Sequence, residues 1–133
     1  MQFYSTNRKT SPVSLREAVV RGLAADRGLF MPEVIRRFPP AFYQNMKEMT
    51  LREISFVVAE AFFGEDVEAG KLKEIVDETL NFDIPLVQVA DNRYSLELFH
   101  GPTLAFKDVG ARFMARLLAY FNKQEGERQV NVL

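Results

Sequence analysis

The chain has 133 residues, of which 47% are hydrophobic and 26% are charged, a composition that suits one compact domain with a modest core. Its net charge of −1 gives no reason to expect nucleic acid or an anionic membrane surface as a partner. The absence of cysteine excludes disulfides and cysteine nucleophiles, and a single histidine excludes a His-rich metal site.

Targeting and membrane signals are missing from the sequence. The first residues lack the basic region and apolar stretch of a signal peptide, and no apolar run approaches the roughly 20 residues of a membrane span. We therefore expect a soluble, cytoplasmic protein with neither a membrane nor a nucleic acid as its partner.

The first predicted element is a helix that begins after Ser14. Ser14-x-x-Glu17 has the form of a capping box, and apolar residues follow it at helical spacing. Gly22 or Gly28 should end this helix. Asp26-Arg27-Gly28 then predicts a tight turn, and Leu29-Phe30-Met31 before Pro32 predicts a short extended piece, since the residue before proline avoids the helical region.

Three more helix starts follow between residues 39 and 66. Pro39 and Pro40 suit a helix N-terminus. A second capping box, Thr50-x-x-Glu53, predicts a helix that ends at Gly64. Asp66 should cap the next helix, whose apolar stripe of Leu72, Ile75, Val76, Thr79 and Leu80 faces a core.

The pattern becomes β-rich after residue 85. Leu86–Val89 and Tyr94–Leu98 flank the turn residues Asp91-Asn92 and predict a β-hairpin. A loop from His100 to Thr103 leads into another helix, and Gln129–Leu133 begins a further strand. We expect an α/β fold, helix-rich with a hairpin and the first strand of a sheet whose remainder is missing, and therefore a fragment of a longer protein.

Lys107 is the most informative residue of the chain. It opens the last predicted helix, although cations favour helix C-termini, so its amine is pushed toward the neutral, nucleophilic form that can attack a carbonyl. By this chemistry alone, a solvated lysine that reaches into water is the more common outcome. Both interpretations stay open on the residues themselves.

The neighbours of Lys107 carry similar alternatives. Phe106 is a core residue or a cofactor neighbour, and Thr103 is a helix N-cap in preference to a ligand contact. Asp108 either complements the helix dipole or holds Lys107 or the backbone in place. His100 is an acid or base, or a packing residue. Arg112 lies about 140° around the helix from Lys107 and is not assigned to the site.

These segments together resemble a known family. Phe99-His100-Gly101-Pro102-Thr103-Leu104-Ala105-Phe106-Lys107-Asp108 resembles the pyridoxal-phosphate lysine motif of threonine synthases. Tyr4-Ser5-Thr6-Asn7 and the segment from Ala24 to Pro32 resemble the opening of their longer bacterial and fungal type. The resemblance covers essentially the whole chain.

The resemblance implies a fold-type II pyridoxal 5′-phosphate enzyme, a carbon-oxygen lyase that converts O-phospho-L-homoserine and water to L-threonine and phosphate. It implies a pyridoxal-phosphate imine on Lys107, with Phe106 also at the cofactor. Residues 1–133 would be the N-terminal domain or fragment of that enzyme, ending where a further sheet domain starts.

The chain departs from the family pattern because it ends before a Ser-Gly-Asp-Thr-Gly type segment and before the glycine-rich cup for the cofactor phosphate. We therefore expect the piece to be inactive by itself. One alternative is another fold-type II lyase, such as a serine or threonine dehydratase. The other is a non-catalytic binding module in which Lys107 is a solvated helix residue.

Overall fold

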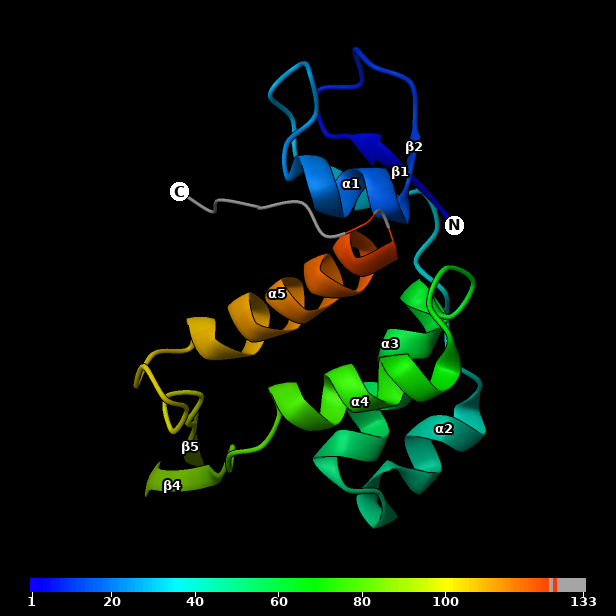
Figure 1. Cartoon of the computed structure of the whole chain (residues 1–133). Helices are drawn as coiled ribbons and strands as arrows, with labels where there is room; N and C mark the ends of the chain where they lie inside the picture. Colours follow the sequence, from blue (N-terminus) through cyan, green and yellow to red (C-terminus); the bar gives the residue numbers. More distant parts are fainter. Residues whose placement is uncertain (125, 127–133) are drawn as a thin grey trace.

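The computed structural model describes residues 1–124 and 126, which contain helices and two small antiparallel sheets (Figure 1). The mixed α/β composition agrees with the sequence-based expectation. The predicted strand Gln129–Leu133 lies outside the described residues. In chain order the elements are β1 (Gln2–Ser5), β2 (Val13–Ser14), α1 (Leu15–Arg21), β3 (Phe30–Pro32), α2 (Pro40–Asn45), the 3-10 helix η1 (Met46–Glu48), α3 (Leu51–Phe63), α4 (Ala69–Thr79), β4 (Leu86–Ala90), β5 (Arg93–Leu96) and α5 (Lys107–Gln124).

The N-terminal sheet has the strand order β2-β1-β3, with β1 antiparallel to both neighbours. Phe3 pairs with Val13 on one side and with Pro32 on the other, and its side chain is buried in the core. The extended piece around Phe30 was predicted from the sequence, whereas β1 and β2 were not. Neither β1 nor the two-residue β2 is marked by a short turn or a proline of the kind that revealed the other strands, so their alternation could not be recognised without knowledge of their partners.

A polar network around Asp26 holds the loops of this sheet together. Its carboxylate accepts hydrogen bonds from the Ser5 hydroxyl at 2.6 Å and from the amides of Gly28 at 3.0 Å and Lys9 at 2.9 Å. The Ser5 hydrogen bond is the main reason that the pKa of Asp26 is lowered. The predicted tight turn at Asp26–Gly28 is therefore confirmed, with long-range partners that the sequence did not reveal.

Most predicted helix ends are confirmed. The Ser14 hydroxyl accepts from the Glu17 amide, and α1 ends at Gly22, whose φ of 70° suits a residue without a Cβ. The Thr50–Glu53 capping box is complete, and Gly64 caps the C-terminus of α3.

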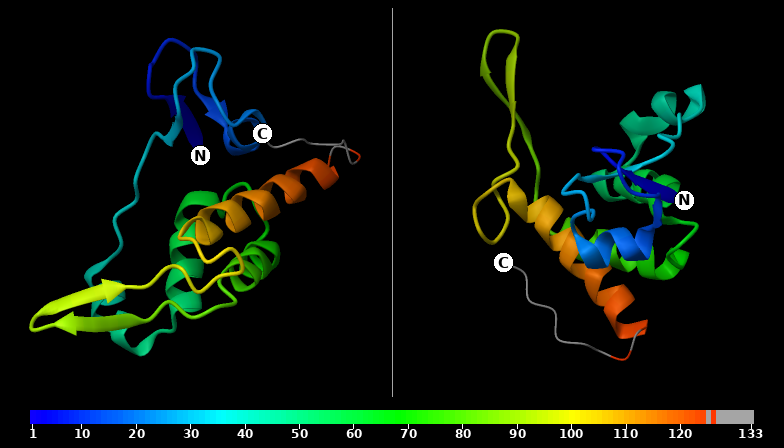
Figure 2. Two further views of the ribbon diagram at one scale, coloured as in Figure 1. Left: turned by 90° about the vertical axis from the view of Figure 1, so that its left-hand side faces the viewer. Right: turned by 90° about the horizontal axis from the view of Figure 1, so that it is seen from above.

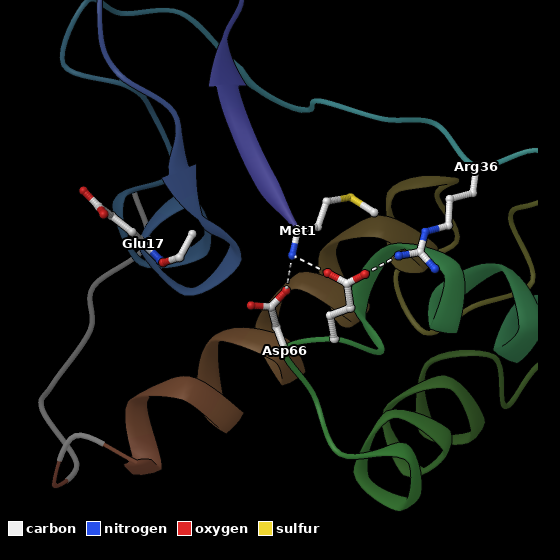
Figure 3. Close-up of polar contacts among 6 residues, drawn as sticks. Met1, Glu17, Arg36 and Asp66 are labelled. Carbon is white, nitrogen blue, oxygen red and sulfur yellow. Dashed lines mark hydrogen bonds and ion pairs between the residues drawn. The ribbon is translucent and has the colours of Figure 1, made fainter.

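The predicted cap at Asp66 is wrong. The side chain of Glu68 caps α4 instead, because it immediately precedes the helix and accepts from the amides of Gly70 and Lys71. Asp66 pairs with the amino group of Met1 at 3.3 Å, and Glu65 accepts from the same amine at 2.9 Å (Figure 3). Arg36 also pairs with Glu65, so these charges tie the start of the sheet to the helical part.

The core lies where α1, α4 and α5 meet beneath the N-terminal sheet. Helix α4 packs against α3 and α5, and α5 packs against α1. The side chains at the centre are apolar and buried: Phe3, Leu15, Leu72, Val76, Leu117 and Phe121. Among the described residues, no helix is both long and apolar enough to cross a bilayer.

The predicted hairpin is confirmed as the antiparallel pair β4–β5, with Asn92 at φ 56° in its turn. It projects away from the helical part in Figure 1 and in the right-hand view of Figure 2. Its apolar side chains remain exposed, among them Leu86 at 64%, Val89 at 63% and Tyr94 at 57%.

Candidate active site

Helix α5 carries Lys107 as its first residue, and its position is set by contacts along its length. Leu117 and Phe121 are buried against the core. Arg112 donates to the Glu78 carbonyl at 2.6 Å and to the Asn81 side chain at 2.9 Å, which ties α5 to the end of α4. Arg112 therefore has a structural role between these two helices.

The loop before α5 closes upon Asp108. The carboxylate of Asp108, 3% exposed, accepts a hydrogen bond from the Thr103 amide at 2.9 Å. A Cβ at Gly101 would lie 2.5 Å from the Asp108 carboxylate oxygen and 2.8 Å from its Cβ. Thr103 lies four residues before Lys107, the first residue of α5, so it does not occupy the N-cap position that the sequence predicted for it. Of the two predicted roles for Asp108, the structure supports the one in which it holds the backbone.

Lys107 and Phe106 lie together at the exposed start of α5. Both side chains are exposed, Phe106 to 67%. Gly110 follows one turn later, and a Cβ there would meet nothing within 4 Å. An accessible amine, an aromatic ring and adjacent open space can accommodate a planar ring with an aldehyde, so these residues fit pyridoxal phosphate as far as the described chain extends.

His100 lies at the other end of the loop. Its Nε2 is 2.7 Å from a carboxylate oxygen of Glu97, and its ring stacks on Phe99 with centroids 4.8 Å apart. This arrangement matches the packing interpretation of His100. Its relation to the chemistry of Lys107 stays a prediction.

The surface has two hollows of note, and Lys107 lines neither of them. A groove of about 670 Å³ has a predominantly apolar lining that includes Phe3, Val109 and Met114. A larger, open one of about 1140 Å³ contains the cations Arg52 and Lys73, but Arg52 donates to the Leu80 carbonyl and Lys73 pairs with Asp77. Within the described residues, no group of three or more His, Cys, Asp or Glu could hold a metal ion.

Sequence reasoning missed two features of this loop. It did not foresee that Gly101 and Asp108 touch, and it did not foresee the φ of 55° at Leu104. The only available signal for the first was a glycine seven positions before an acid in a helix first turn. Neither feature follows from helical or strand periodicity, because the loop has none.

The chain is similar to proteins of known identity. A family model described as "Threonine synthase N terminus" matches residues 2–80. The threonine synthase of Serratia marcescens is 38% identical over 133 residues, which is 100% of this chain and 30% of that protein. The threonine synthase of Haemophilus influenzae is 40% identical over 119 residues, which is 90% of this chain and 28% of that protein.

Solved structures agree with the sequence relatives. A threonine synthase from Brucella melitensis with pyridoxal phosphate bound superposes with a TM-score of 0.90 at 34% identity, covering 96% of this chain and 29% of that one. The threonine synthase of Escherichia coli gives a TM-score of 0.85 at 36% identity, covering 91% and 28%. The chain thus spans less than a third of the length of these relatives.

Proposed function

The chain belongs to the threonine synthase family, and from that membership we propose that Lys107 is the lysine that binds pyridoxal 5′-phosphate covalently. The proposed reaction, for a protein of its relatives' full length, is the conversion of O-phospho-L-homoserine and water to L-threonine and phosphate. This makes the protein a pyridoxal-phosphate-dependent carbon-oxygen lyase.

One observation carries the assignment of the lysine. The amine of Lys107 is accessible at the start of α5, beside the exposed ring of Phe106 and with open space at Gly110 one turn along the helix. Phe106 would lie beside the cofactor. The relative from Brucella melitensis with pyridoxal phosphate bound supports the choice of cofactor.

The residues of this chain supply a defined part of the chemistry. When bound, pyridoxal phosphate supplies an electron sink for negative charge at the substrate carbons. Lys107 would hold the aldehyde carbon of the cofactor and, after the substrate amine displaces it, move protons to and from the substrate. Anchoring of α5 by Arg112 and the buried Leu117 would keep that amine in one place.

The substrate and the complete activity belong to a longer polypeptide in this proposal. The chain spans about 30% of the length of its Serratia relative, and the phosphate cradle of the cofactor is expected in the remaining part. We infer that residues 1–133, taken alone, bind the cofactor weakly and do not turn over substrate.

Reductive trapping tests the lysine. The full-length protein is incubated with pyridoxal phosphate, reduced with borohydride and mapped by peptide mass spectrometry. We expect the label on Lys107 and its loss in Lys107→Ala. Lys123→Ala removes an exposed lysine from the other end of the same helix and should keep the label. A label confined to another lysine would overturn the assignment.

Substrate assays test the reaction. Full-length protein should release phosphate and form threonine from O-phosphohomoserine, whereas a dehydratase would consume threonine or serine. Consumption of threonine without phosphate release would favour the dehydratase alternative. The same assay on residues 1–133 should give no product.

A further inference from the structure

We propose that Asp108 is a positioning residue whose buried carboxylate, folded over Gly101 and bonded to the Thr103 amide, fixes the direction of Lys107. The proposal rests on the proposed function, since it gives a purpose to the placement of that lysine. We call the contacts of Asp108 with Gly101 and Thr103 the Asp108 clamp.

The burial of Asp108 is the first observation. An acid in the first turn of a helix complements the dipole without being fully buried, as the half-buried Glu17 does in α1. Asp108 is instead 3% exposed, and a buried carboxylate is costly unless it is hydrogen-bonded. Its bond to the Thr103 amide at 2.9 Å offsets part of that cost and closes the loop onto the helix.

The absence of a side chain at Gly101 is the second observation. A Cβ there would lie 2.5 Å from the Asp108 carboxylate oxygen and 2.9 Å from its Cγ, far inside van der Waals contact. The loop and the acid therefore approach as closely as a glycine permits. This contact is steric and does not depend on the charge of Asp108.

Backbone strain at Leu104 is the third observation. Leu104 has φ 55° and is 76% exposed, so no packing of its own side chain favours this left-handed conformation. Its amide donates to the Gly101 carbonyl at 3.0 Å, next to the bond between Thr103 and Asp108. A strained residue persists where its surroundings over-determine it, and the clamp supplies that restraint.

Helix geometry links the clamp to the lysine. Successive residues of an α-helix point about 100° apart. Because Asp108 is held in the interior, Lys107 lies on the exposed side of the same helix turn. The segment that carries Phe106 lies between Thr103 and Asp108, so the clamp holds both of its ends. Releasing Asp108 would let the first turn of α5 fray, and the amine of Lys107 would lose its fixed position.

Three substitutions at Asp108 separate geometry from charge in the full-length protein. Asp108→Asn removes the charge but keeps an oxygen that can accept from Thr103. Asp108→Glu keeps the charge but adds a methylene where Gly101 leaves no room. Asp108→Ala removes both. Glu17→Ala removes a half-buried first-turn acid, paired with Arg21, from α1 and is the control for loss of such an acid elsewhere.

The readouts are the rate of borohydride-trapped labelling of Lys107 by pyridoxal phosphate and the hydrogen exchange of the Thr103 amide. If the clamp positions Lys107, Asp108→Asn labels within about threefold of the rate of the unmodified protein, whereas Asp108→Glu and Asp108→Ala label on the order of tenfold or more slowly and lose protection of the Thr103 amide. A role limited to the helix dipole would give Asp108→Glu a normal labelling rate and make Asp108→Asn as slow as Asp108→Ala. That result overturns the proposal.

Gly101→Ala attacks the same contact while leaving Asp108 intact, so it covers the case in which Asp108→Ala fails to fold. It should slow labelling of Lys107 and speed exchange of the Thr103 amide. Unchanged labelling and exchange in this variant would contradict the clamp. If Lys107 is unlabelled in the unmodified protein, the proposed function fails, while exchange of the Thr103 amide still decides whether the clamp exists.

Discussion

The N-terminal sheet and the β4–β5 hairpin are both small and antiparallel, but they are held in place by different means. The sheet buries Phe3 in the core, and the carboxylate of Asp26 accepts hydrogen bonds from the Ser5 hydroxyl in β1 and from two loop amides. The hairpin has its own pairing and leaves Leu86 and Tyr94 more than half exposed. A two-stranded hairpin is marginal by itself, so the sheet should contribute more than the hairpin to the stability of the chain.

The largest expected effect comes from replacing one aromatic ring in each region. Phe3→Ala should lower the free energy of unfolding of the 133-residue chain by about 3–5 kcal/mol, because a buried ring leaves a cavity. Tyr94→Ala, at an exposed position of the hairpin, should change it by no more than about 0.5 kcal/mol. Urea unfolding monitors both, and equal losses would mean that the hairpin shares the core's stability.

The next largest effect on stability is expected from substituting alanine for Gly28, with Gly110 as the comparison. A Cβ at Gly28 would lie 2.0 Å from the Ser5 hydroxyl and 2.9 Å from the Asn7 amide, and that backbone atom cannot rotate away. Gly28→Ala should therefore cost about 1–3 kcal/mol in thermal or urea unfolding. Gly110→Ala, where the space is open and the backbone helical, should gain about 0.5–1 kcal/mol. A neutral Gly28→Ala would contradict the close approach of the two loops.

Acidification should weaken the sheet. The Ser5 hydroxyl lowers the pKa of Asp26 below its usual 3.8, so the folded state favours the ionised carboxylate. The contribution of Asp26 to the stability of the folded state is present above the pKa of this carboxyl in the unfolded chain. It is lost as the pH falls through its lower pKa in the folded chain. Asp26→Asn should flatten the loss of stability below about pH 4, measured by urea midpoints.

The control for this effect lies in the hairpin turn. Asp91→Asn removes an exposed acid from that turn and should leave the acid profile of the unmodified chain in place. The lowered pKa values of Glu53 and Glu65 contribute to the same acid loss, so the comparison is between variants rather than within one profile. Identical profiles for Asp26→Asn and Asp91→Asn would contradict the role of Asp26.

The smallest expected effect concerns the amino group of Met1. Hydrogen bonding to Glu65 raises its pKa above 8.0, so its contribution is complete below the unfolded pKa and is lost as the pH rises through the folded one. Glu65→Gln should reduce the decline of stability between about pH 7 and about pH 10. Urea midpoints at the two pH values measure this decline. An unchanged decline in Glu65→Gln would show that the Met1 amino group does not contribute to it.

The comparison also explains what could be predicted. The hairpin was found from its turn residues Asp91-Asn92 and its β-rich flanks, because all of its determinants are local. Strands β1 and β2 were missed, because no two-residue turn joins them, β2 has only two residues, and the other partner of β1 is the distant segment Phe30–Pro32. The cap of α4 was misplaced from Glu68 to Asp66 because two acids precede the helix and local patterns do not rank them.

At the candidate active site, too, one part could be predicted from the sequence and another could not. The segment around Phe106 and Lys107 was recognisable as a motif, and the family it suggested is the family to which the chain belongs. The role of Lys107 stays a prediction until the lysine is mapped. The burial of Asp108 beside the exposed Lys107 could not be foreseen, since it depends on how α5 lies against the loop.

The amino-acid sequence alone determined the helix caps at Ser14 and Thr50, the hairpin turn and the lysine motif, because each depends on residues within a few positions of one another. The tertiary structure alone decided the N-terminal sheet, the three partners of Asp26 and the contact between Asp108 and Gly101. Such contacts form only when packing of the core brings separate segments together, and local patterns carry no information about that approach.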